Sequence, residues 1–378
     1  MRLRCSFLFL FVLFFTALCT ASAQNSPTSE LKNVIEKLDG QITTELTKDS
    51  FGGVTVGIIS GGNLVWTKSY GMADTEKKIP ATKDTIYRIG SITKQFTALM
   101  LLQLVQEGKV HFTDPVEKYF SEVNKIQGRF SGAPPITLIQ LATHTSGLAP
   151  EPDNTETYLE GSVSSWEKVL VAALPQTEYA FEPGTRYSYS NIGYAILGAA
   201  LSRAAGQPYV EYVKEHIFKP LGMNNTFFEP NEQMRAKLAK GYLFEDGKID
   251  TSVAEHEHEG RGYKVPNGAI YTTAEDLARF VAFEMGQGPE IVLKKENLEA
   301  NFKRMITATN VELKRGYGLG FQVIRLGDTV IYGHNGGVAG YQAEAFFSLD
   351  LPMGVIILRN AVGGSFSSSN ILRKVFEK

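Results

Sequence analysis

The chain has 378 residues, of which 43% are hydrophobic and 21% are charged, and its formal net charge is -2. These proportions are typical of a globular protein with a large core and not of a disordered chain. A charge this close to zero provides no basic surface for a polyanion, so we exclude nucleic acid as a partner and expect a small-molecule or peptide substrate.

Residues 1–23 are predicted to be a secretory signal peptide. Basic residues precede an apolar run at 7–18, and the small residues at 21–23 match a cleavage site. The run is shorter than the roughly 20 apolar residues of a spanning helix, so we expect an exported protein, periplasmic or extracellular, with no stable membrane span after cleavage. Cys5 and Cys19 both lie in this segment, which excludes disulfides and cysteine-bound metals from the mature chain.

The predicted strands gather at the two ends of the mature chain, and helical patterns with Pro- and Gly-rich loops fill the middle. In chain order, the predicted elements are an amphipathic helix at 31–42, strands at 54–60 and 64–70 joined by a Gly-Gly-Asn turn, strands at 321–326, 329–332, 341–349 and 354–358, and an amphipathic tail at 371–376. We therefore predict an α+β fold in which residues 24–90 and 266–378 build an antiparallel sheet flanked by helices, with residues 91–265 inserted as a mostly helical domain.

One predicted helix, residues 91–107, is apolar on almost every face and should be buried on all sides. Lys94 lies within it, on the stripe that continues through Ala98 and Leu101. Because burial disfavours the ammonium form, the pKa of such a lysine falls unless another charge compensates. Ser91 is three residues earlier on the same helical face, so its hydroxyl and the Lys94 amine can meet. A serine hydroxyl is a poor nucleophile until a neighbouring base takes its proton, and Lys94 is a candidate for that base.

The pattern Ser-x-x-Lys is a weak indication by itself, because it occurs three times in the chain. Ser29 with Lys32 and Ser165 with Lys168 lie at the starts of ordinary amphipathic helices, where the serines are expected to be N-caps. A cap alone does not explain a lysine inside the most hydrophobic helix of the chain. The copy that begins at Ser91 is therefore the one that predicts chemistry.

Two further segments carry polar side chains suited to a binding cleft. Tyr189 and Asn191 are two residues apart in an extended segment, so their side chains can face the same side, although Tyr189 could equally be a buried aromatic before a helix N-terminus. A predicted strand runs into Gly333-His334-Asn335-Gly336-Gly337. Glycines in a strand often mark the close approach of a ligand or of another backbone, but His334 on its own would more often be structural.

Taken in order, Ser91-Ile92-Thr93-Lys94, Tyr189-Ser190-Asn191 and His334-Asn335-Gly336 resemble the S-x-x-K, Y-x-N and K-T-G or H-x-G motifs of the serine β-lactamase and penicillin-binding protein family. The resemblance is to the branch of class C β-lactamases, D-alanyl-D-alanine carboxypeptidases and related esterases. It covers nearly the whole mature chain and includes the stretches LATHTSGL at 141–148 and YGLGF at 317–321. It implies a β-lactamase/transpeptidase-like fold and an acyl-enzyme mechanism with no metal and no organic cofactor.

The resemblance also implies catalytic roles. Ser91 would attack an acyl carbonyl and form an ester with the substrate. Lys94 and Tyr189 would share proton abstraction and proton delivery to the leaving group, and which of the two is the general base stays open. The backbone N–H groups of Ser91 and Gly337 would form the oxyanion hole.

A second set of residues would face the substrate. Asn191 would hydrogen-bond the substrate amide, and Asn335 and Gly336 would line the site. His334 would be a further catalytic residue and would face the cleft where other members of the family carry lysine. An imidazole is a weaker permanent cation than lysine, and Asn335 replaces a hydroxyl residue, so recognition of a substrate carboxylate is in doubt. We therefore expect a carboxypeptidase-like or esterase-like serine hydrolase before a true β-lactamase.

Two other interpretations stay open at this point. A catalytically silent relative that binds cell-wall peptides would keep the fold with a damaged site, against which the intact Ser91, Lys94 and Tyr189 count. His256 and His258 lie among three glutamates and could chelate a divalent ion, but with no third ligand at a suitable spacing a solvated acidic loop is expected. The absence of a G-x-S-x-G motif counts against an α/β-hydrolase.

Overall fold

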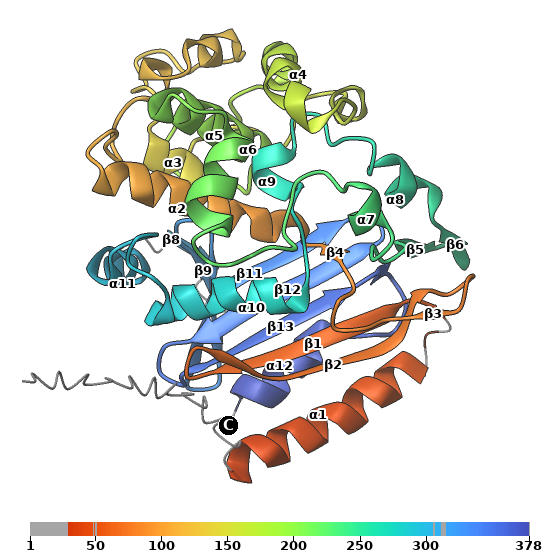
Figure 1. Ribbon diagram of the computed structural model, residues 1–378. Helices are drawn as coiled ribbons and strands as arrows, with labels where there is room; N and C mark the ends of the chain where they lie inside the picture. Colours follow the sequence, from red (N-terminus) through yellow and green to blue (C-terminus); the bar gives the residue numbers. More distant parts are fainter. Residues whose placement is uncertain (1–28, 48, 50, 305–306, 311–314, 378) are drawn as a thin grey trace, which may run out of the picture.

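One antiparallel sheet joins the two ends of the chain (Figure 1). The computed structural model describes residues 29–377 without 48, 50, 305–306 and 311–314. Within these residues, nine strands pair in the order β3-β2-β1-β13-β12-β11-β10-β9-β8. The predicted signal peptide, 1–23, lies outside the described residues. The strands of this sheet are β1 (Gly53–Ser60), β2 (Asn63–Asp74), β3 (Ile79–Pro80), β8 (Thr307–Asn310), β9 (Arg315–Tyr317), β10 (Gln322–Leu326), β11 (Thr329–Val338), β12 (Tyr341–Ser348) and β13 (Met353–Arg359).

Strand β1 links the N-terminal hairpin to the C-terminal strands. It pairs with β2 on one side and with β13 on the other, where Val54 lies opposite Arg359 and Ile58 opposite Val355. All of its residues except Ser60 are buried, as expected of a strand rich in β-branched residues and covered on both faces. The prediction of an α+β fold with an antiparallel sheet built from both ends of the chain is therefore confirmed.

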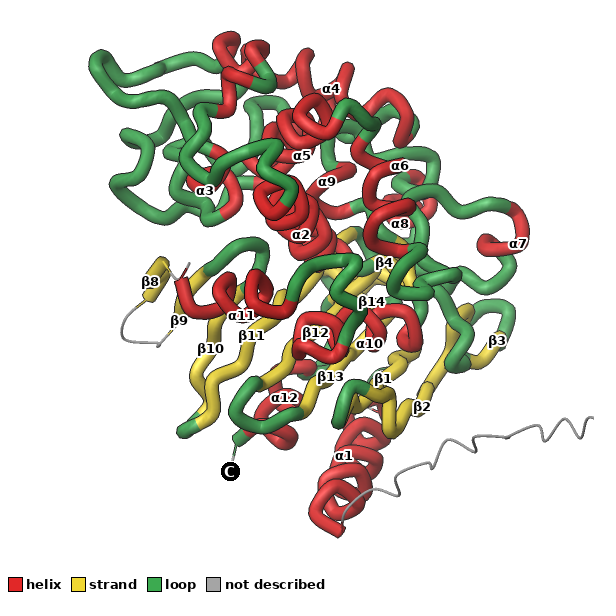
Figure 2. The backbone as a smooth tube through the Cα atoms, turned by 60° about the vertical axis from the view of Figure 1, so that its left-hand side comes forward, coloured by secondary structure: helices red, strands yellow, loops and turns green. Residues whose placement is uncertain are grey.

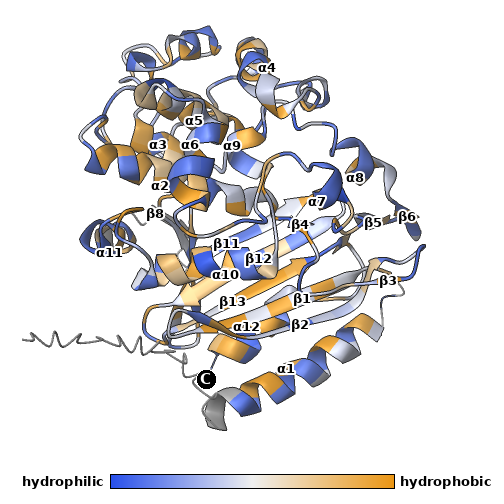
Figure 3. Cartoon of the chain, in the orientation of Figure 1, coloured by the Kyte–Doolittle hydropathy of each residue, from blue (hydrophilic) through white to orange (hydrophobic). Residues whose placement is uncertain are grey.

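Helices cover both faces of the sheet (Figures 1 and 2). On the outer face, α1 (Ser29–Thr47) and α12 (Ser368–Phe376) share one core cluster with apolar residues of β1 and β13, and both strands are hydrophobic along most of their length (Figure 3). On the inner face, α10 (Ala274–Ala282) packs against the same two strands. Beyond it lie α2 (Thr93–Gln106), α3 (Leu138–Ala142), α4 (Trp166–Ala173), α5 (Asn191–Ala205), α6 (Tyr209–Val213) and α9 (Val265–Gly268).

Two small pairings bring distant segments next to the central strand β12. Strand β4 (Tyr87–Arg88) pairs with β7 (Tyr271–Thr272), which places α9 beside the start of α2. Strands β5 (Tyr242–Glu245), β6 (Lys248–Asp250) and β14 (Ala361–Val362) form a second small sheet near β12. The remaining helices are α7 (Glu232–Arg235), α8 (Ser252–His256) and α11 (Lys295–Arg304). Among the described helices, none combines the length and the hydrophobicity needed to cross a bilayer.

Strand β11 is longer than the sequence predicts. The prediction ends it at Tyr332, but it continues to Val338, because the glycine-rich segment stays in register with β12 from Gly333 opposite Phe346 to Val338 opposite Tyr341. Strand β10 pairs with β11 only as far as Gly333. Residues 334–338 therefore have β12 along one edge, and the turn that carries Ser91 packs against this segment.

The predicted helix at 91–107 begins two residues later than expected. Gly90–Ile92 forms a 3-10 turn, and α2 starts at Thr93. Gly90 has a φ of 49°, a conformation that glycine adopts without strain, and a side chain there would collide with the backbone of Gly337. The turn thus exposes Ser91 at the N-terminal end of a buried helix, directly beside β11.

Candidate active site

The Ser91 hydroxyl and the Lys94 amine meet at the start of α2. Lys94 Nζ lies 3.1 Å from Ser91 Oγ, and it also donates to Asn191 Oδ1 at 2.7 Å and to the carbonyl oxygen of Asn267 at 3.1 Å. The lysine is completely buried, whereas Ser91 is half-buried. An amine held at three points in this way has one orientation, with the serine hydroxyl in reach.

The environment of Lys94 favours its neutral form. Burial holds the pKa of the amine well below its usual range, and the positive charges of Lys264 and Arg261 act in the same direction. The carboxylate of Glu151 opposes them by attracting the protonated amine. An uncharged amine can take a proton, so this environment suits Lys94 to the predicted role of general base.

Tyr189 lies close to both Ser91 and Lys94, in the segment that leads into α5. The side chain of Ser91 is close enough to the Tyr189 phenol to influence its pKa, and the Lys94 Nζ is 4.8 Å from the centre of the tyrosine ring. Burial raises the pKa of this phenol above its usual value, although Ser91 acts in the opposite direction. In the resting site the phenol therefore keeps its proton and can deliver it.

His334 projects from β11 toward the same aromatic cluster and is 1% exposed. Its Nδ1 donates to the carbonyl oxygen of Asn335, so its Nε2 accepts from the hydroxyl of Tyr317 at 3.1 Å. Burial and the nearby Lys94 lower the pKa of the imidazole to about 3. The histidine is neutral, and its ring centre is 6.1 Å from that of Tyr189. It borders the Ser91 site and does not supply a cation there.

The buried, neutral state of His334 should make stability depend on pH. Because its pKa is near 3 when folded and about 6.5 when unfolded, only the unfolded chain takes up this proton between those values. The free energy of unfolding should therefore fall by about 1.4 kcal/mol per pH unit on this account as the pH drops below 6.5. In urea titrations between pH 7 and pH 4.5, His334→Asn should lose stability less steeply than the native chain.

The exposed His111 provides the control for this measurement. The variant His111→Asn should follow the native pH dependence of stability. Parallel curves for the native chain and His334→Asn would show that the imidazole of His334 is protonated in the fold.

The two N–H groups expected to form an oxyanion hole lie on adjoining backbones. A Cβ atom built on Gly90 would lie 3.0 Å from the nitrogen of Gly337, and one built on Gly336 would lie 3.3 Å from the nitrogen of Ser91 and would overlap the carbonyl oxygen of Ile89. Glycine at 90 and 336 is what allows the turn and the strand to approach this closely. A Cβ atom on Gly337 would meet no atom within 4 Å, so the strand faces open space there.

The two asparagines predicted to contact substrate have different surroundings. The amide of Asn191 accepts from Lys94 through Oδ1 and donates through Nδ2 to Glu151 at 2.7 Å, so it connects the amine to a carboxylate. The side chain of Asn335 is exposed, and its Oδ1 accepts from Gln322 at 2.8 Å. Since side chains alternate along a strand, Asn335 lies on the opposite face of β11 from His334.

Two residues around Lys94 have no signal in the sequence. Glu151 accepts hydrogen bonds from Asn191, from Tyr263 and from Lys264, the last at 2.9 Å. Asn267 on α9 accepts from Lys94 through its backbone and donates from its side chain to the carbonyl oxygen of Asn191 at 2.8 Å. Both come from loops or short helices without a repeating pattern, so only the folded chain identifies them.

His144 belongs to the stretch LATHTSGL, and its role becomes visible in the structure. The backbone N–H of Ser190 donates to His144 Nδ1 at 3.0 Å, and the imidazole packs against Tyr189 with ring centres 4.2 Å apart. The histidine is completely buried, and burial holds its pKa well below the usual range. It acts as a neutral support that fixes the position of the tyrosine.

Removing the charge of Glu151 should shift the pH dependence of the site. Its carboxylate raises the pKa of Lys94, so in Glu151→Gln the amine should lose its proton at lower pH. If Lys94 is the base, the acidic limb of a kcat/KM profile should move to lower pH in this variant. The exposed Glu178 supplies a control, Glu178→Gln, in which the profile should stay unchanged. An acidic limb that does not move in Glu151→Gln would assign that limb to another group.

The two histidines of the acidic segment do not converge. His258 is bonded to Tyr271 through Nδ1 at 2.8 Å, whereas the nearest acid to the exposed His256 is Glu160 at 3.8 Å. The glutamate between them, Glu257, forms ion pairs with two arginines. Across the described part of the chain, no group of three or more His, Cys, Asp or Glu residues is arranged to hold a metal ion.

Comparison with known proteins assigns this chain to a family. The profile of the Beta-lactamase family matches residues 33–376. Beta-lactamase-like protein 2 of Dictyostelium discoideum is 32% identical over 71% of this chain and 48% of its own length, and protein flp of Staphylococcus aureus strain MW2 is 30% identical over 66% and 49%. The chain thus spans about half the length of the curated relatives it matches.

Solved structures agree with this assignment. The octameric penicillin-binding protein homologue from Pyrococcus abyssi superposes with a TM-score of 0.74 and 28% identity, over 90% of this chain and 76% of its own. A class C beta-lactamase gives a TM-score of 0.74 at 20% identity, over 91% and 95%, and supports the fold alone. The predicted β-lactamase/transpeptidase-like fold is confirmed, and the chain belongs to the beta-lactamase family.

Proposed function

We propose that this chain is a serine hydrolase that cleaves an ester or amide bond through an acyl-enzyme on Ser91, in the manner of a D-alanyl carboxypeptidase or an esterase. The observation that carries the proposal is the 3.1 Å contact between Ser91 Oγ and the amine of Lys94, a lysine with no exposed surface. Residues 1–23 support export of the protein before it meets its substrate.

In the proposed reaction, the neutral amine of Lys94 takes the proton of Ser91 as the hydroxyl oxygen bonds to the substrate carbonyl carbon. The opposite shifts of the two pKa values support this choice of base, because burial favours a neutral Lys94 and a protonated Tyr189. The backbone N–H groups of Ser91 and Gly337 stabilise the negative charge that forms on the carbonyl oxygen, and each such donor contributes about 3–4 kcal/mol in other hydrolases.

Collapse of the tetrahedral intermediate breaks the bond to the leaving group, which receives a proton through Tyr189. Water then adds to the carbonyl carbon of the ester on Ser91. The bond from that carbon to the serine oxygen breaks, the serine oxygen takes up a proton, and the acid is released. The neutral state of His334 supports an esterase, because the carboxylate that D-alanyl peptides and β-lactams share finds no permanent cation at this position.

Active-site labelling tests the proposal. After incubation with a fluorescent penicillin or a fluorophosphonate, intact mass and peptide mapping should find a single adduct on Ser91, and the Ser91→Ala variant should carry none. No adduct from either reagent, or an adduct elsewhere, would overturn the proposal and favour a silent relative. We expect turnover of a p-nitrophenyl ester to exceed that of a D-alanyl-D-alanine peptide and that of a chromogenic cephalosporin, both of which carry a carboxylate.

A further inference from the structure

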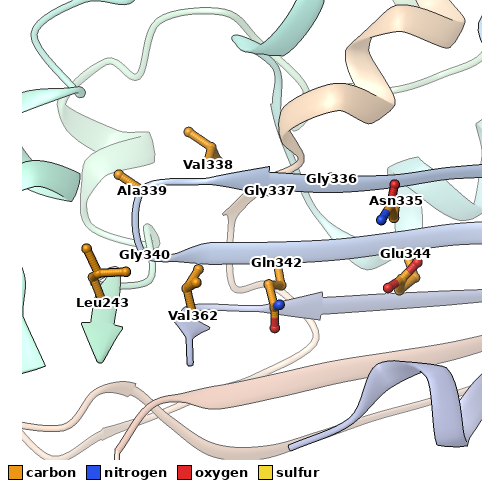
Figure 4. Close-up of a pocket in the computed structure, with 10 residues that line it drawn as sticks. All are labelled: Leu243, Asn335, Gly336, Gly337, Val338, Ala339, Gly340, Gln342, Glu344 and Val362. Atoms are coloured by element: carbon orange, nitrogen blue, oxygen red, sulfur yellow. The ribbon is translucent and has the colours of Figure 1, made fainter. Parts of the chain in front are cut away.

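A pocket of about 330 Å³ opens on the outer face of β11 and β12 (Figure 4), opposite the face of β11 on which Gly336 packs against the Ser91 turn. Asn335, Gly337, Gln342 and Glu344 line it from these two strands, and Leu243 and Val362 close it from the small sheet of β5 and β14. Gly337 belongs both to this lining and to the backbone that packs against Gly90, next to Ser91. The backbone of Gly337 therefore links the pocket to the turn that carries Ser91.

The register of the two strands places the polar side chains on one face. Asn335 lies opposite Glu344, and Gly337 lies opposite Gln342. The side chains of Asn335, Gln342 and Glu344 therefore lie on the face of the sheet opposite to that of His334, and Gly337 leaves a gap between them. Because Gly337 has no side chain and a Cβ there would meet nothing within 4 Å, no side chain separates the strand from the pocket at that position. A substrate group that passes over the outer face of β11 at Gly337 would reach the side chains of Gln342 and Glu344.

Glu344 is the charged residue of this lining. Its Oε1 accepts from the hydroxyl of Ser368 at 2.7 Å, and among the described residues no partner is bonded to Oε2. The side chain is half-buried, and burial raises its pKa to about 7. A partly buried carboxyl group is stabilised by a hydrogen-bond donor or a positive charge brought next to it.

No lysine or arginine offsets this acid within the pocket lining. The guanidinium nearest in register is that of Arg359, which lies opposite Gln342 on β13. It is 1% exposed and is held by the carboxylate of Asp49 at 2.6 Å. The pocket therefore offers a carboxyl group and two amides, and no cation, to whatever enters it.

We propose that this pocket is a specificity subsite, which accepts a protonated amine or another hydrogen-bond donor on the substrate and rejects a carboxylate. The inference rests on the proposed function, since it places the scissile carbonyl at Ser91, and it adds the chemical class of the substrate. It makes Glu344 a specificity-determining residue that takes no part in bond cleavage.

Matched substrates test the subsite. Phenyl esters of one acid that carry a 3-(dimethylaminomethyl), a 3-(hydroxymethyl) or a 3-carboxy group place a cation, a neutral donor or an anion at the same ring position. A second series carries the same three groups on the acyl part. In one of the two series, kcat/KM should fall in that order, with the amine at least about tenfold above the carboxylate. In Glu344→Gln this ratio should shrink to less than about threefold, mostly through KM.

A surface variant and a binding measurement complete the test. Glu290→Gln changes the net charge equally at an exposed site and should keep the native ratio. In the Ser91→Ala protein, calorimetry should find that 3-(dimethylaminomethyl)phenol, or the matching amine from the acyl series, binds more tightly than its carboxylate analogue, and Glu344→Gln should remove the difference. Equal binding with Glu344 intact, or an unchanged preference without it, would overturn the subsite. Failure of the proposed function would appear instead as no turnover above the Ser91→Ala background.

Discussion

Replacing Lys94 with methionine should lower the rate of acylation at Ser91 by about three orders of magnitude, within the range that general base catalysis supplies. Methionine has a similar length and no branch, so it can fill the buried channel between α2 and α5. It removes the amine 3.1 Å from the serine oxygen and leaves the oxygens of Asn191 and Asn267 without this donor. The rate of labelling by a fluorophosphonate measures the loss directly.

A second lysine of the same local pattern provides the control for Lys94→Met. Lys168 follows Ser165 by three residues, but its side chain is exposed on α4. Lys168→Met should label at the native rate. Circular dichroism should show that both variants are folded. Native labelling in Lys94→Met would move the role of general base away from the amine, with Tyr189 as the next candidate.

The Ser91–Lys94 contact could be predicted because it is local. Residues three apart on a helix share a face whatever the rest of the fold does, and a lysine among apolar residues signals burial. The hairpin of β1 and β2 is predictable for the same reason, because the turn residues Gly61-Gly62-Asn63 lie between two runs of residues that favour strands. In both cases the relevant neighbours lie within a few residues along the chain.

The continuation of β11 and the contacts of Glu151 depend on neighbours that are distant in sequence. Glycine has a low intrinsic preference for strands, so the segment after Tyr332 is not expected to be extended. Its pairing with β12 and the packing of Gly90 against it override that preference. Glu151 reaches Lys94 through Asn191, 40 residues away from it, and no spacing rule connects the two.

The charges of the site share this dependence on the fold. The sequence indicates that Lys94 is buried, and burial lowers its pKa, but the carboxylate that opposes this shift and the two cations that add to it come from other segments. The sequence likewise places His334 in a glycine-rich motif, but its neutrality follows from its burial beside Tyr317. Residue type thus indicates which chemistry is available, whereas burial decides which protonation state is present.

A pair of adjacent glycines gives the sharpest test of how β11 serves the site. In Gly336→Ala, the new methyl group would overlap the carbonyl oxygen of Ile89 and lie 3.3 Å from the nitrogen of Ser91, so the strand and the turn must move apart. We expect a loss of about 1–3 kcal/mol in unfolding free energy, as for other overpacked sites. Acylation should slow by about 100-fold or more, because one donor of the proposed oxyanion hole is displaced.

Gly337→Ala is the matched variant, since its methyl group would enter open space and its backbone nitrogen keeps its hydrogen. Its unfolding free energy should stay within about 0.5 kcal/mol of the native value, as for other substitutions that create no clash. Urea titration and the rate of fluorophosphonate labelling measure both variants side by side. If Gly336→Ala and Gly337→Ala were equally stable and labelled equally fast, close contact between β11 and the Ser91 turn would not be what positions the two N–H groups. Because the two positions are neighbours on one strand, a large difference between them can only reflect which face of β11 touches the turn.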